Sequence, residues 1–365
     1  MKLLRRLGLY NLNWNQIRQT WNFNRFLVVL GVRVRIADAA LTTNLGERRG
    51  PGEWGLSNRI YRPWHVPRGR WKSDFLPDVL VVAQHGRFGN MIRQLSLAIA
   101  VAERLGIREV LVKSLPQFPL GTWALDNGVA LTHDPWLRTR MIARPRLVLG
   151  GDFFVKPRLP ITVEGVDFDV IGRSLLESLG MGTLEPQDSS TVVIHFRSGD
   201  AFHATPHGNL GQPPFSFYEK LLSSENPTRV VLVYEDRANP VIAEVEGHLD
   251  ARGITYAVQS SSFEEDLTVL LSATTLVTAQ GTLAEALLLL SPHVTRWIHF
   301  GKPHRPFFRS RGVESAVSIV DSTGEYSEQI FNGNWTNSDA QRSLMMSFPE
   351  DKLELTESKT PKSRQ

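Results

Sequence analysis

The chain contains no cysteine. That absence excludes a disulfide framework, a thiolate zinc site and a cysteine nucleophile. Long apolar runs are also absent, because the longest one near the start covers only residues 26–32, whereas a bilayer span needs roughly 20 residues. The small-residue cleavage site of a signal peptide is not evident after this run. We therefore expect no transmembrane anchor and a cytoplasmic protein, with the inner face of the membrane as the alternative location.

The composition is that of a globular protein, with 42% apolar and 21% charged residues. At 365 residues the chain is longer than one hydrophobic core usually supports, so we expect two domains with a cleft between them. Changes of pattern divide the chain into four predicted parts: a basic extension and connector over 1–75, an N-terminal α/β domain over 76–187, a C-terminal Rossmann-like domain over 188–335, and a disordered tail over 336–365.

The extension is strongly basic, with 13 Lys and Arg against 3 Asp and Glu in residues 1–70. Its first apolar residues are spaced three and four apart, which predicts an amphipathic helix with the cations off the apolar stripe. Trp14 and Trp21 on such a helix suit a membrane interface, where indole rings lie at headgroup level and cations meet anionic lipid. Docking on the protein's own core fits the same pattern. Both interpretations of residues 1–30 stay open.

Strands and helices alternate along most of the remaining chain. The first domain begins with a predicted strand at 79–83, a helix at 91–105 and a strand at 110–112, and its pattern weakens over 115–187. Alternation in the second domain implies a parallel sheet covered by helices on both faces. Ligands of such sheets bind beyond the carboxyl ends of the strands. The second domain has predicted strands at 191–196, 230–234, 255–258, 275–279 and 297–300, and helices at 215–223, 240–252, 263–272 and 282–290.

Three strand ends carry residues suited to phosphate. The segments 86–90 and 280–282 each open a helix, where free amides and a partial positive charge attract anions. Arg197 follows the strand at 191–196, and a guanidinium matches phosphate oxygens without losing its charge. His195, two residues earlier, can point to the same face. Two such loops facing each other with an arginine would form a diphosphate site, and the alternative is a structural Arg197–Asp200 ion pair beside a buried His195.

These segments carry a family resemblance over roughly residues 79–300. Gly86-Arg87-Phe88-Gly89-Asn90, followed by Gln94, resembles the glycine-rich opening of the fucosyltransferase superfamily. His195-Phe196-Arg197-Ser198-Gly199-Asp200 is similar to that superfamily's His-x-Arg-x-Gly-Asp motif, closest to the α-1,2-fucosyltransferases (glycosyltransferase family 11-like). Asp266-Leu267 and Val277–Thr282 match the place of its third, hydroxyl-rich motif. Met91, Ser198 and Gln280-Gly281 depart from it, because the family commonly has Gln, a second Arg and Asn-Ser there.

The resemblance implies a GT-B-like fold of two Rossmann-type domains and a metal-independent, inverting transfer of fucose from GDP-fucose to a hydroxyl of a glycan or glycolipid acceptor. Its implied catalytic residues are Arg197 on the β-phosphate and His195 on phosphate or ribose. In an inverting transfer the acceptor hydroxyl must also lose a proton, and Asp200 and His203 are the candidates for the catalytic base. Residues 76–187 would face the acceptor. The implied donor-binding residues are Gly86, Arg87, Phe88, Gly89, Asn90, Glu235, Asp236, Gln280, Gly281 and Thr282.

Other functions fit parts of the sequence. Asp167-Phe168-Asp169 could hold a divalent cation for a metal-dependent transferase, although no strong apolar strand precedes it. His195, Asp200, His203 and His207 could bind a metal, but their spacing is unequal. We expect neither site to hold metal. A non-catalytic sugar-nucleotide or glycan-binding protein is the alternative function. We expect no nucleic-acid partner, because the aromatic residues of the basic segment follow a helical stripe rather than a stacking platform.

Overall fold

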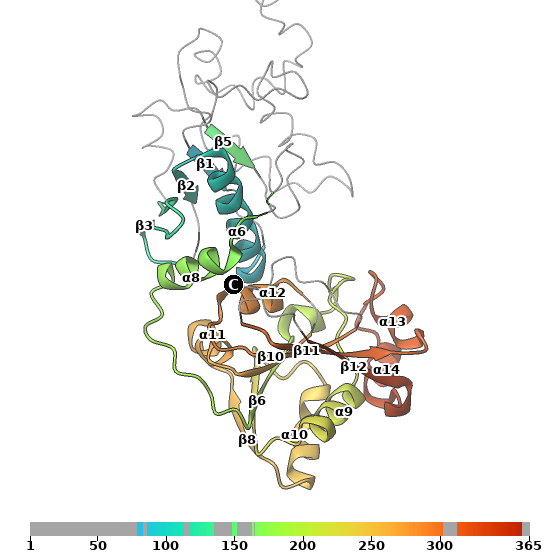
Figure 1. Cartoon of the computed structure of the whole chain (residues 1–365). Coiled ribbons are helices and arrows are strands. Elements are labelled where there is room, and N and C mark those ends of the chain that lie inside the picture. Colours follow the sequence, from blue (N-terminus) through green and yellow to red (C-terminus); the bar gives the residue numbers. More distant parts are fainter. Residues whose placement is uncertain are drawn as a thin grey trace, which may run out of the picture. The chain divides into compact units, whose positions relative to one another are not determined.

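The computed structural model describes residues 79–82, 86–112, 115, 117–134, 148–151, 163, 165–279, 281–301 and 312–359. The predicted basic extension and amphipathic helix lie outside these residues, as does Gln280. The chain divides into two compact units between Gly180 and Met181. Each unit is described by itself below, and Figure 1 labels the elements in chain order. No helix in the described residues is both long and apolar enough to span a bilayer.

The N-terminal unit is a mainly parallel sheet with helices (Figure 1). Within the described residues its strand order is β3-β4-β2-β1-β5, and only the β3–β4 pair is antiparallel. That pair is a hairpin whose turn places Gly128 at a φ of 79°, where glycine is favoured. The elements are β1 (Val79–Val82), α6 (Phe88–Leu105), β2 (Glu109–Val112), β3 (Gly121–Ala124), β4 (Ala130–His133), β5 (Val148–Gly151) and α8 (Phe168–Ser178).

The helix α6 begins three residues earlier than the sequence predicts. Phe88, Gly89 and Asn90 form its first turn instead of a loop, so that of the segment 86–90 only Gly86 and Arg87 precede the helix. The apolar stretch from Met91 onward is buried almost without interruption, so the first turn extends a helix that the core already holds. The helix ends where predicted, at Leu105, and the Gly106 that follows has a φ of 67°, the left-handed conformation that closes helices.

The C-terminal unit has a seven-stranded sheet in its described residues, with the order β12-β11-β10-β9-β6-β7-β8. Only β12, at one edge, runs antiparallel to its neighbour. Its elements are β6 (Thr191–Phe196), η2 (Gly199–Phe202), α9 (Phe215–Glu225), β7 (Arg229–Tyr234), α10 (Val241–Ala251), β8 (Thr255–Gln259), α11 (Phe263–Leu271), β9 (Thr275–Thr278), α12 (Thr282–Leu290), β10 (Arg296–Phe300), β11 (Ser315–Asp321), α13 (Glu325–Ile330), α14 (Asp339–Ser347), η3 (Glu350–Lys352) and β12 (Leu353–Lys359).

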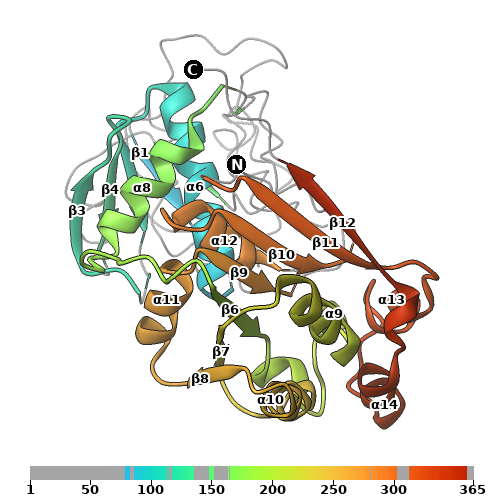
Figure 2. The ribbon, with the colours of Figure 1, turned by 60° about the horizontal axis from the view of Figure 1, so that its bottom comes forward.

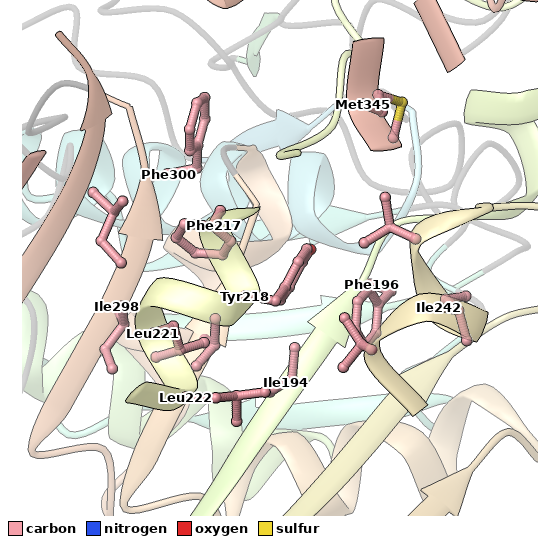
Figure 3. Close-up of a cluster of buried hydrophobic side chains, with 14 of the residues drawn as sticks. Ile194, Phe196, Phe217, Tyr218, Leu221, Leu222, Ile242, Ile298, Phe300 and Met345 are labelled. Atoms are coloured by element: carbon pink, nitrogen blue, oxygen red, sulfur yellow. The ribbon is translucent and has the colours of Figure 1, made fainter. Parts of the chain in front are cut away.

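Alternation along the strands divides the sheet of this unit into two faces. Ile194 and Phe196 of β6 join a core with the helices α9 and α10. Figure 3 shows Phe217 and Leu221 of α9 among the strand residues of this core. The helices α11 and α12 cover the opposite face (Figure 2). The predicted α/β class with two Rossmann-type units is therefore confirmed, while the cleft expected between them stays a prediction.

The predicted disordered tail over 336–365 is wrong for most of its length. Residues from Asp339 to Ser347 form α14, and β12 adds a strand to the sheet beside β11. The helix begins with a capping box, in which the Ser338 and Gln341 side chains each bond the other's backbone amide. Met345 and Leu353 are buried in the core of the unit. The polar composition of the tail reflects its solvent-facing side, and its few apolar residues supply the core contacts.

Replacing either of two glycines in the C-terminal unit by alanine should change stability in opposite directions. A Cβ on Gly208 would lie 2.2 Å from the backbone oxygen of Gly333, whereas a Cβ on Gly247, exposed in α10, would meet no described atom within 4 Å. We expect Gly208→Ala to lower the free energy of unfolding by about 1–3 kcal/mol, because a backbone must shift. Gly247→Ala should raise it by about 0.5–1 kcal/mol through helix propensity. Urea unfolding of both variants tests this, and an unchanged midpoint for Gly208→Ala would contradict the close packing.

Candidate functional site

The strand order of the C-terminal unit creates one place where a ligand fits best. From β6 the chain moves through β7 to β8 on one side, and it then returns to the other side of β6 to form β9. Loops that leave neighbouring strands in opposite directions open a crevice at the carboxyl end of the sheet. Here these loops begin with Arg197 after β6 and Ala279 after β9. The loop that begins with Arg197 and the loop that opens α12 are therefore neighbours at one end of the same sheet.

The side chains at the end of β6 follow the alternation that the sequence predicts. Ile194 and Phe196 point into the core with α9 and α10. His195, between them, lies on the opposite face, in register with Thr278 of β9. Arg197 follows the strand and lies near enough to His195, on this face, for its charge to act on the imidazole. The same face is covered by α12, whose first residue is Thr282. The sheet thus places an imidazole, a guanidinium and a helix N-terminus on one side of the switch point.

His195 is only partly exposed to solvent. Burial lowers its pKa, and the nearby charge of Arg197 lowers it further, to about 4. The imidazole is therefore neutral at physiological pH and presents one donor and one acceptor nitrogen. A neutral imidazole can bond a phosphate oxygen or a sugar hydroxyl.

Arg197 forms the ion pair that the sequence offers as the structural alternative. Its terminal nitrogen Nη2 lies 2.5 Å from Oδ1 of Asp200, and the two side chains are 25% and 31% exposed. Its Nε is buried and has no hydrogen-bond partner among the described residues. An unpaired buried donor is costly, by about 1–3 kcal/mol. The guanidinium is thus held by one carboxylate at one end while its remaining donors are not all used.

A cross-link between two loops fixes the backbone around Arg197. Ser198 is buried and donates its hydroxyl to Oδ1 of Asp236, which follows β7. The same oxygen accepts the amides of Gly199 at 3.2 Å and Ala238 at 2.9 Å. Partial burial alone would raise the pKa of Asp236, but the hydrogen bonds from Ser198 and these amides outweigh it, so its pKa lies below the ordinary value. The Asp236 carboxylate therefore holds this loop as an anion.

Asn239 completes this cross-link, although sequence reasoning missed it. Its amide donates to Oγ of Ser198 at 3.2 Å, and its Nδ2 donates to the carbonyl of Arg197 at 3.1 Å. The side chain is 1% exposed, and its Oδ1 accepts the amide of Val241 at the start of α10. Its place just before Pro240, after the end of β7, is the signal that could have drawn attention to it.

Gly199 and Glu235 approach each other closely. Gly199 has a φ of 54°, which favours glycine, and a Cβ there would lie 2.5 Å from Oε2 of Glu235. The Glu235 side chain thus lies across the backbone of the β6 loop, while the residue as a whole is exposed. The two acidic residues predicted to contact a nucleobase are both exposed, and Asp236 is in addition bonded to its own loops by three donors.

The loop after β9 opens α12 through Gly281. Its φ of 149° is a conformation that favours glycine, and a Cβ there would meet no described atom within 4 Å. The N-cap of α12 is Gly281, which has no side chain to cap the first turn. The amides at a helix start carry a partial positive charge and suit an anion. Thr282 occupies the first helical position and is partly exposed.

The glycine-rich segment 86–90 belongs to the other unit. Gly86 and Arg87 are exposed, whereas the ring of Phe88 is 4% exposed and therefore belongs to the core. Asn90 folds back over Gly86, whose φ is 63° and whose Cβ would lie 2.1 Å from Nδ2 of Asn90. Gly89 is buried. Of the predicted donor-binding side chains in this segment, Arg87 and Asn90 are the accessible ones.

The alternative metal sites have structural explanations. Asp167 is the N-cap of α8, and its Oδ1 accepts the amides of Asp169 at 2.9 Å and Val170 at 3.3 Å. His203 and His207 are exposed, and Nδ1 of His207 accepts the amide of Asn209. Across the described ranges, no three His, Cys, Asp or Glu side chains gather as a metal would require.

Comparisons with known proteins give a weak likeness of fold. A scan against models of protein families found no match, and a search of curated proteins found none either. Among solved structures, a glycosyl transferase family 9 protein from Veillonella parvula has 10% identity and a TM-score of 0.40, covering 74% of this chain and 96% of its own.

Two further solved structures have similarly low sequence identity and TM-scores to this chain. An Arabidopsis thaliana FUT1 variant in complex with GDP has 12% identity and a TM-score of 0.38, covering 78% of this chain and 84% of its own. The E. coli heptosyltransferase WaaC with ADP has 12% identity and a TM-score of 0.36, covering 62% of this chain and 88% of its own. A likeness of this size does not bear on function.

The depressed pKa of His195 predicts a pH-dependent stability. Between pH 6.5 and about 4 the unfolded chain binds a proton at His195 that the folded chain does not. The free energy of unfolding should therefore fall by up to about 3 kcal/mol as the pH is lowered through this window, and this contribution should level off below it. In His195→Gln the free energy of unfolding should fall less over the same pH range. Urea unfolding at several pH values from 7.5 to 4 measures this difference. If the free energy of unfolding falls equally with pH in both proteins, the lowered pKa of His195 is refuted.

Proposed function

We propose that the chain is a glycosyltransferase whose C-terminal unit binds the diphosphate of a sugar nucleotide at Arg197. The observation that carries this proposal is the position of Arg197 at the carboxyl end of β6, at the topological switch point of a doubly wound sheet. The start of α12 at Gly281 and Thr282 lies at the end of the neighbouring strand β9. A guanidinium and a helix N-terminus together supply charge and directed donors for a diphosphate.

The chemistry follows from a charge that grows as the sugar leaves. When the bond to the anomeric carbon breaks, negative charge develops on the β-phosphate, and a fixed cation in a partly desolvated site stabilises it. Arg197 would supply that charge and His195, neutral at physiological pH, would donate a hydrogen bond. Metal would then not be required for the leaving group. The acceptor hydroxyl would lose its proton to a base, for which Asp200 and His203 are the candidates.

The donor we propose is GDP-fucose, with an α-1,2 linkage to a glycan or glycolipid as the product. Support for this finer proposal comes from the sequence motif around Arg197 and from its companions at 86–90 and 277–282. The contacts of Asp236 support a choice between the two acidic residues that follow β7. Because Asp236 already accepts three donors from its own loops, we assign the nucleobase contact to Glu235.

The proposed donor site predicts selective binding of a guanine nucleotide. GDP should raise the melting temperature of the chain by several degrees more than UDP or CDP, since a ligand at about 100 times its Kd stabilises by about 2.7 kcal/mol. Arg197→Ala and Arg197→Lys should both lose most of this shift, because lysine keeps the charge but not the fork of donors. A thermal-shift screen of the three nucleotides measures both effects.

Arg237→Ala is the matched control for that screen. Arg237 lies in the neighbouring β7–α10 loop, is 60% exposed and pairs with Glu246 at 2.7 Å. Its removal should leave the GDP shift unchanged. The shift should also persist in excess EDTA. Equal shifts for GDP, UDP and CDP would remove the fucosyl assignment, and a normal GDP shift in Arg197→Ala would remove the phosphate contact.

A non-catalytic sugar-nucleotide or glycan-binding protein is the second candidate, and the Arg197–Asp200 ion pair favours it. The Asp200 oxygen that contacts Nη2 of Arg197 at 2.5 Å is engaged in that ion pair and is not directed at an acceptor hydroxyl. The two functions differ in turnover. Release of free fucose or its transfer from GDP-fucose supports the enzyme, while GDP binding without any turnover supports the binding protein.

We also propose that residues 1–30 bind the cytoplasmic surface of a membrane, which would bring a lipid-linked acceptor to the site. The support is in the sequence, where Trp14 and Trp21 follow the apolar stripe and the cations Arg5, Arg6 and Arg18 lie off it.

Membrane binding through this segment should depend on anionic lipid. The chain should sediment with vesicles of mixed phosphatidylcholine and phosphatidylglycerol, and binding should weaken as salt rises to 0.5 M because the attraction is screened. A variant with Arg5, Arg6 and Arg18 changed to Ser should sediment much less. Neutral phosphatidylcholine vesicles are the control. Failure of the wild-type chain to sediment with anionic vesicles would favour docking of this segment on the protein itself.

A further inference from the structure

The loop that carries the proposed site is held along its length by a segment near the end of the chain. We call residues 326–337 the C-terminal clasp. Trp335 is its centre, with a side chain that is 1% exposed. Its indole Nε1 donates to the carbonyl of Ala201 at 2.6 Å. Its ring meets the ring of Phe202 edge-on, with centroids 5.5 Å apart. The clasp thus binds η2, the short helix that begins two residues after Arg197.

Asn337 extends this contact by two residues. Its Nδ2 donates to the carbonyls of Phe202 at 2.8 Å and His203 at 3.1 Å. Its backbone has a φ of 58°, a left-handed conformation that asparagine and glycine tolerate best. Three successive carbonyls, of residues 201–203, therefore take their donors from two side chains of the clasp.

The clasp also bonds the far end of the loop that follows β6, at residues 208–212. The amide of Trp335 donates to the carbonyl of Gly208 at 3.1 Å, and the hydroxyl of Tyr326 donates to the carbonyl of Gln212 at 2.6 Å. A Cβ on Gly208 or on Gly211 would each lie 2.2 Å from a clasp backbone oxygen. Loop and clasp are therefore in backbone contact at two positions.

The clasp is itself fixed to the sheet. Asp321, at the end of β11, accepts the amides of Tyr326 at 2.9 Å and Ser327 at 3.0 Å. The Tyr326 ring is fully buried and meets the ring of Phe300 of β10 at 5.7 Å. A segment that is anchored at its start and bonded to three loop carbonyls at its end can transmit the rigidity of the sheet to the loop.

We propose that the C-terminal clasp positions the site, and that Trp335 and Asn337 are its positioning residues. The carbonyls they bind directly follow Asp200, whose carboxylate orients the guanidinium of Arg197. Loss of the clasp contacts frees η2, and with it the Arg197–Asp200 pair. The ordering of the loop stands independently, whereas the effect on ligand binding rests on the proposed function.

Two substitutions remove the clasp contacts with little change of shape. Asn337→Gly keeps the left-handed backbone and removes both donors, and Trp335→Phe keeps a buried ring and removes Nε1. Asn332→Gly is the matched control, because Asn332 also has a left-handed φ, of 59°, and its side chain makes no hydrogen bond to the loop within the described part of the unit. Arg342→Ala tests the other contact of Asn337, since Nε of Arg342 donates to its Oδ1 at 2.8 Å.

Amide hydrogen exchange read by mass spectrometry tests the ordering of the loop without any ligand. Exchange over residues 199–212 should become about tenfold faster in Asn337→Gly and Trp335→Phe, the effect of losing about one hydrogen bond. Exchange over β7 should not change, and Asn332→Gly and Arg342→Ala should match the wild-type chain. Unchanged exchange over 199–212, or an equal rise throughout the unit, would overturn the clasp.

GDP binding, measured by calorimetry on the same proteins, tests the positioning of Arg197. We expect the Kd for GDP to rise about tenfold in Asn337→Gly and Trp335→Phe and to stay unchanged in the two controls. Faster loop exchange with an unaltered Kd would overturn the positioning role. If the wild-type chain binds no GDP, the proposed function fails, and exchange of the Gly199 and Ala201 amides then decides alone whether the clasp orders the site.

Discussion

The carboxylate of Asp236 is the contact on which the arrangement of the site depends. One of its oxygens accepts the Ser198 hydroxyl and the amides of Gly199 and Ala238, so it joins the loops that leave β6 and β7. Neighbouring loops at the carboxyl end of a twisted sheet would otherwise diverge, and Arg197 would have no fixed direction. A charged acceptor makes such hydrogen bonds stronger than neutral ones, which offsets the burial of Ser198. The C-terminal clasp acts on the other side of the same loop. Arg197 therefore stands between two sets of contacts, neither of which involves its own side chain.

The sheet order explains why these contacts converge. The strand β6 lies between β7 and β9, so the loop after it meets one neighbour that carries Asp236 and Asn239 and another that opens α12 at Gly281. The clasp reaches the loop because β10 and β11 continue the sheet beyond β9 and bring residues 326–337 back toward it. The proposed site at this end of the sheet is thus assembled from segments up to more than a hundred residues apart, each placed by the strand that precedes it.

The strands and helices over 191–300 could be predicted because each has a clear apolar period, and their alternation fixes a parallel sheet. His195 and Arg197 could be found for the same reason, since they end a strand. Residues 115–187 gave too little periodicity to predict β3, β4 and α8. The tail could have been predicted in part, because Ser338 and Gln341 have the spacing of a capping box and Leu353 and Leu355 alternate with polar residues. Trp335 and Asn337 could not be assigned to the site, because their partners are backbone carbonyls, which leave no trace in side-chain patterns.

Electrostatics limits what Arg197 can do alone. Asp200, Glu235 and Asp236 surround the end of β6, and His195 is neutral at physiological pH, so one guanidinium faces three carboxylates. A diphosphate brings further negative charge, and at short range in a partly desolvated site the repulsion is not negligible. Asp236 is held by three donors of its own loops, whereas Asp200 contacts the terminal nitrogen Nη2 of the arginine itself. A bound phosphate must therefore share Arg197 with Asp200 or displace it, and the partial positive charge at the start of α12 adds attraction for that phosphate. In the proposed site the helix that Gly281 opens therefore acts together with the arginine.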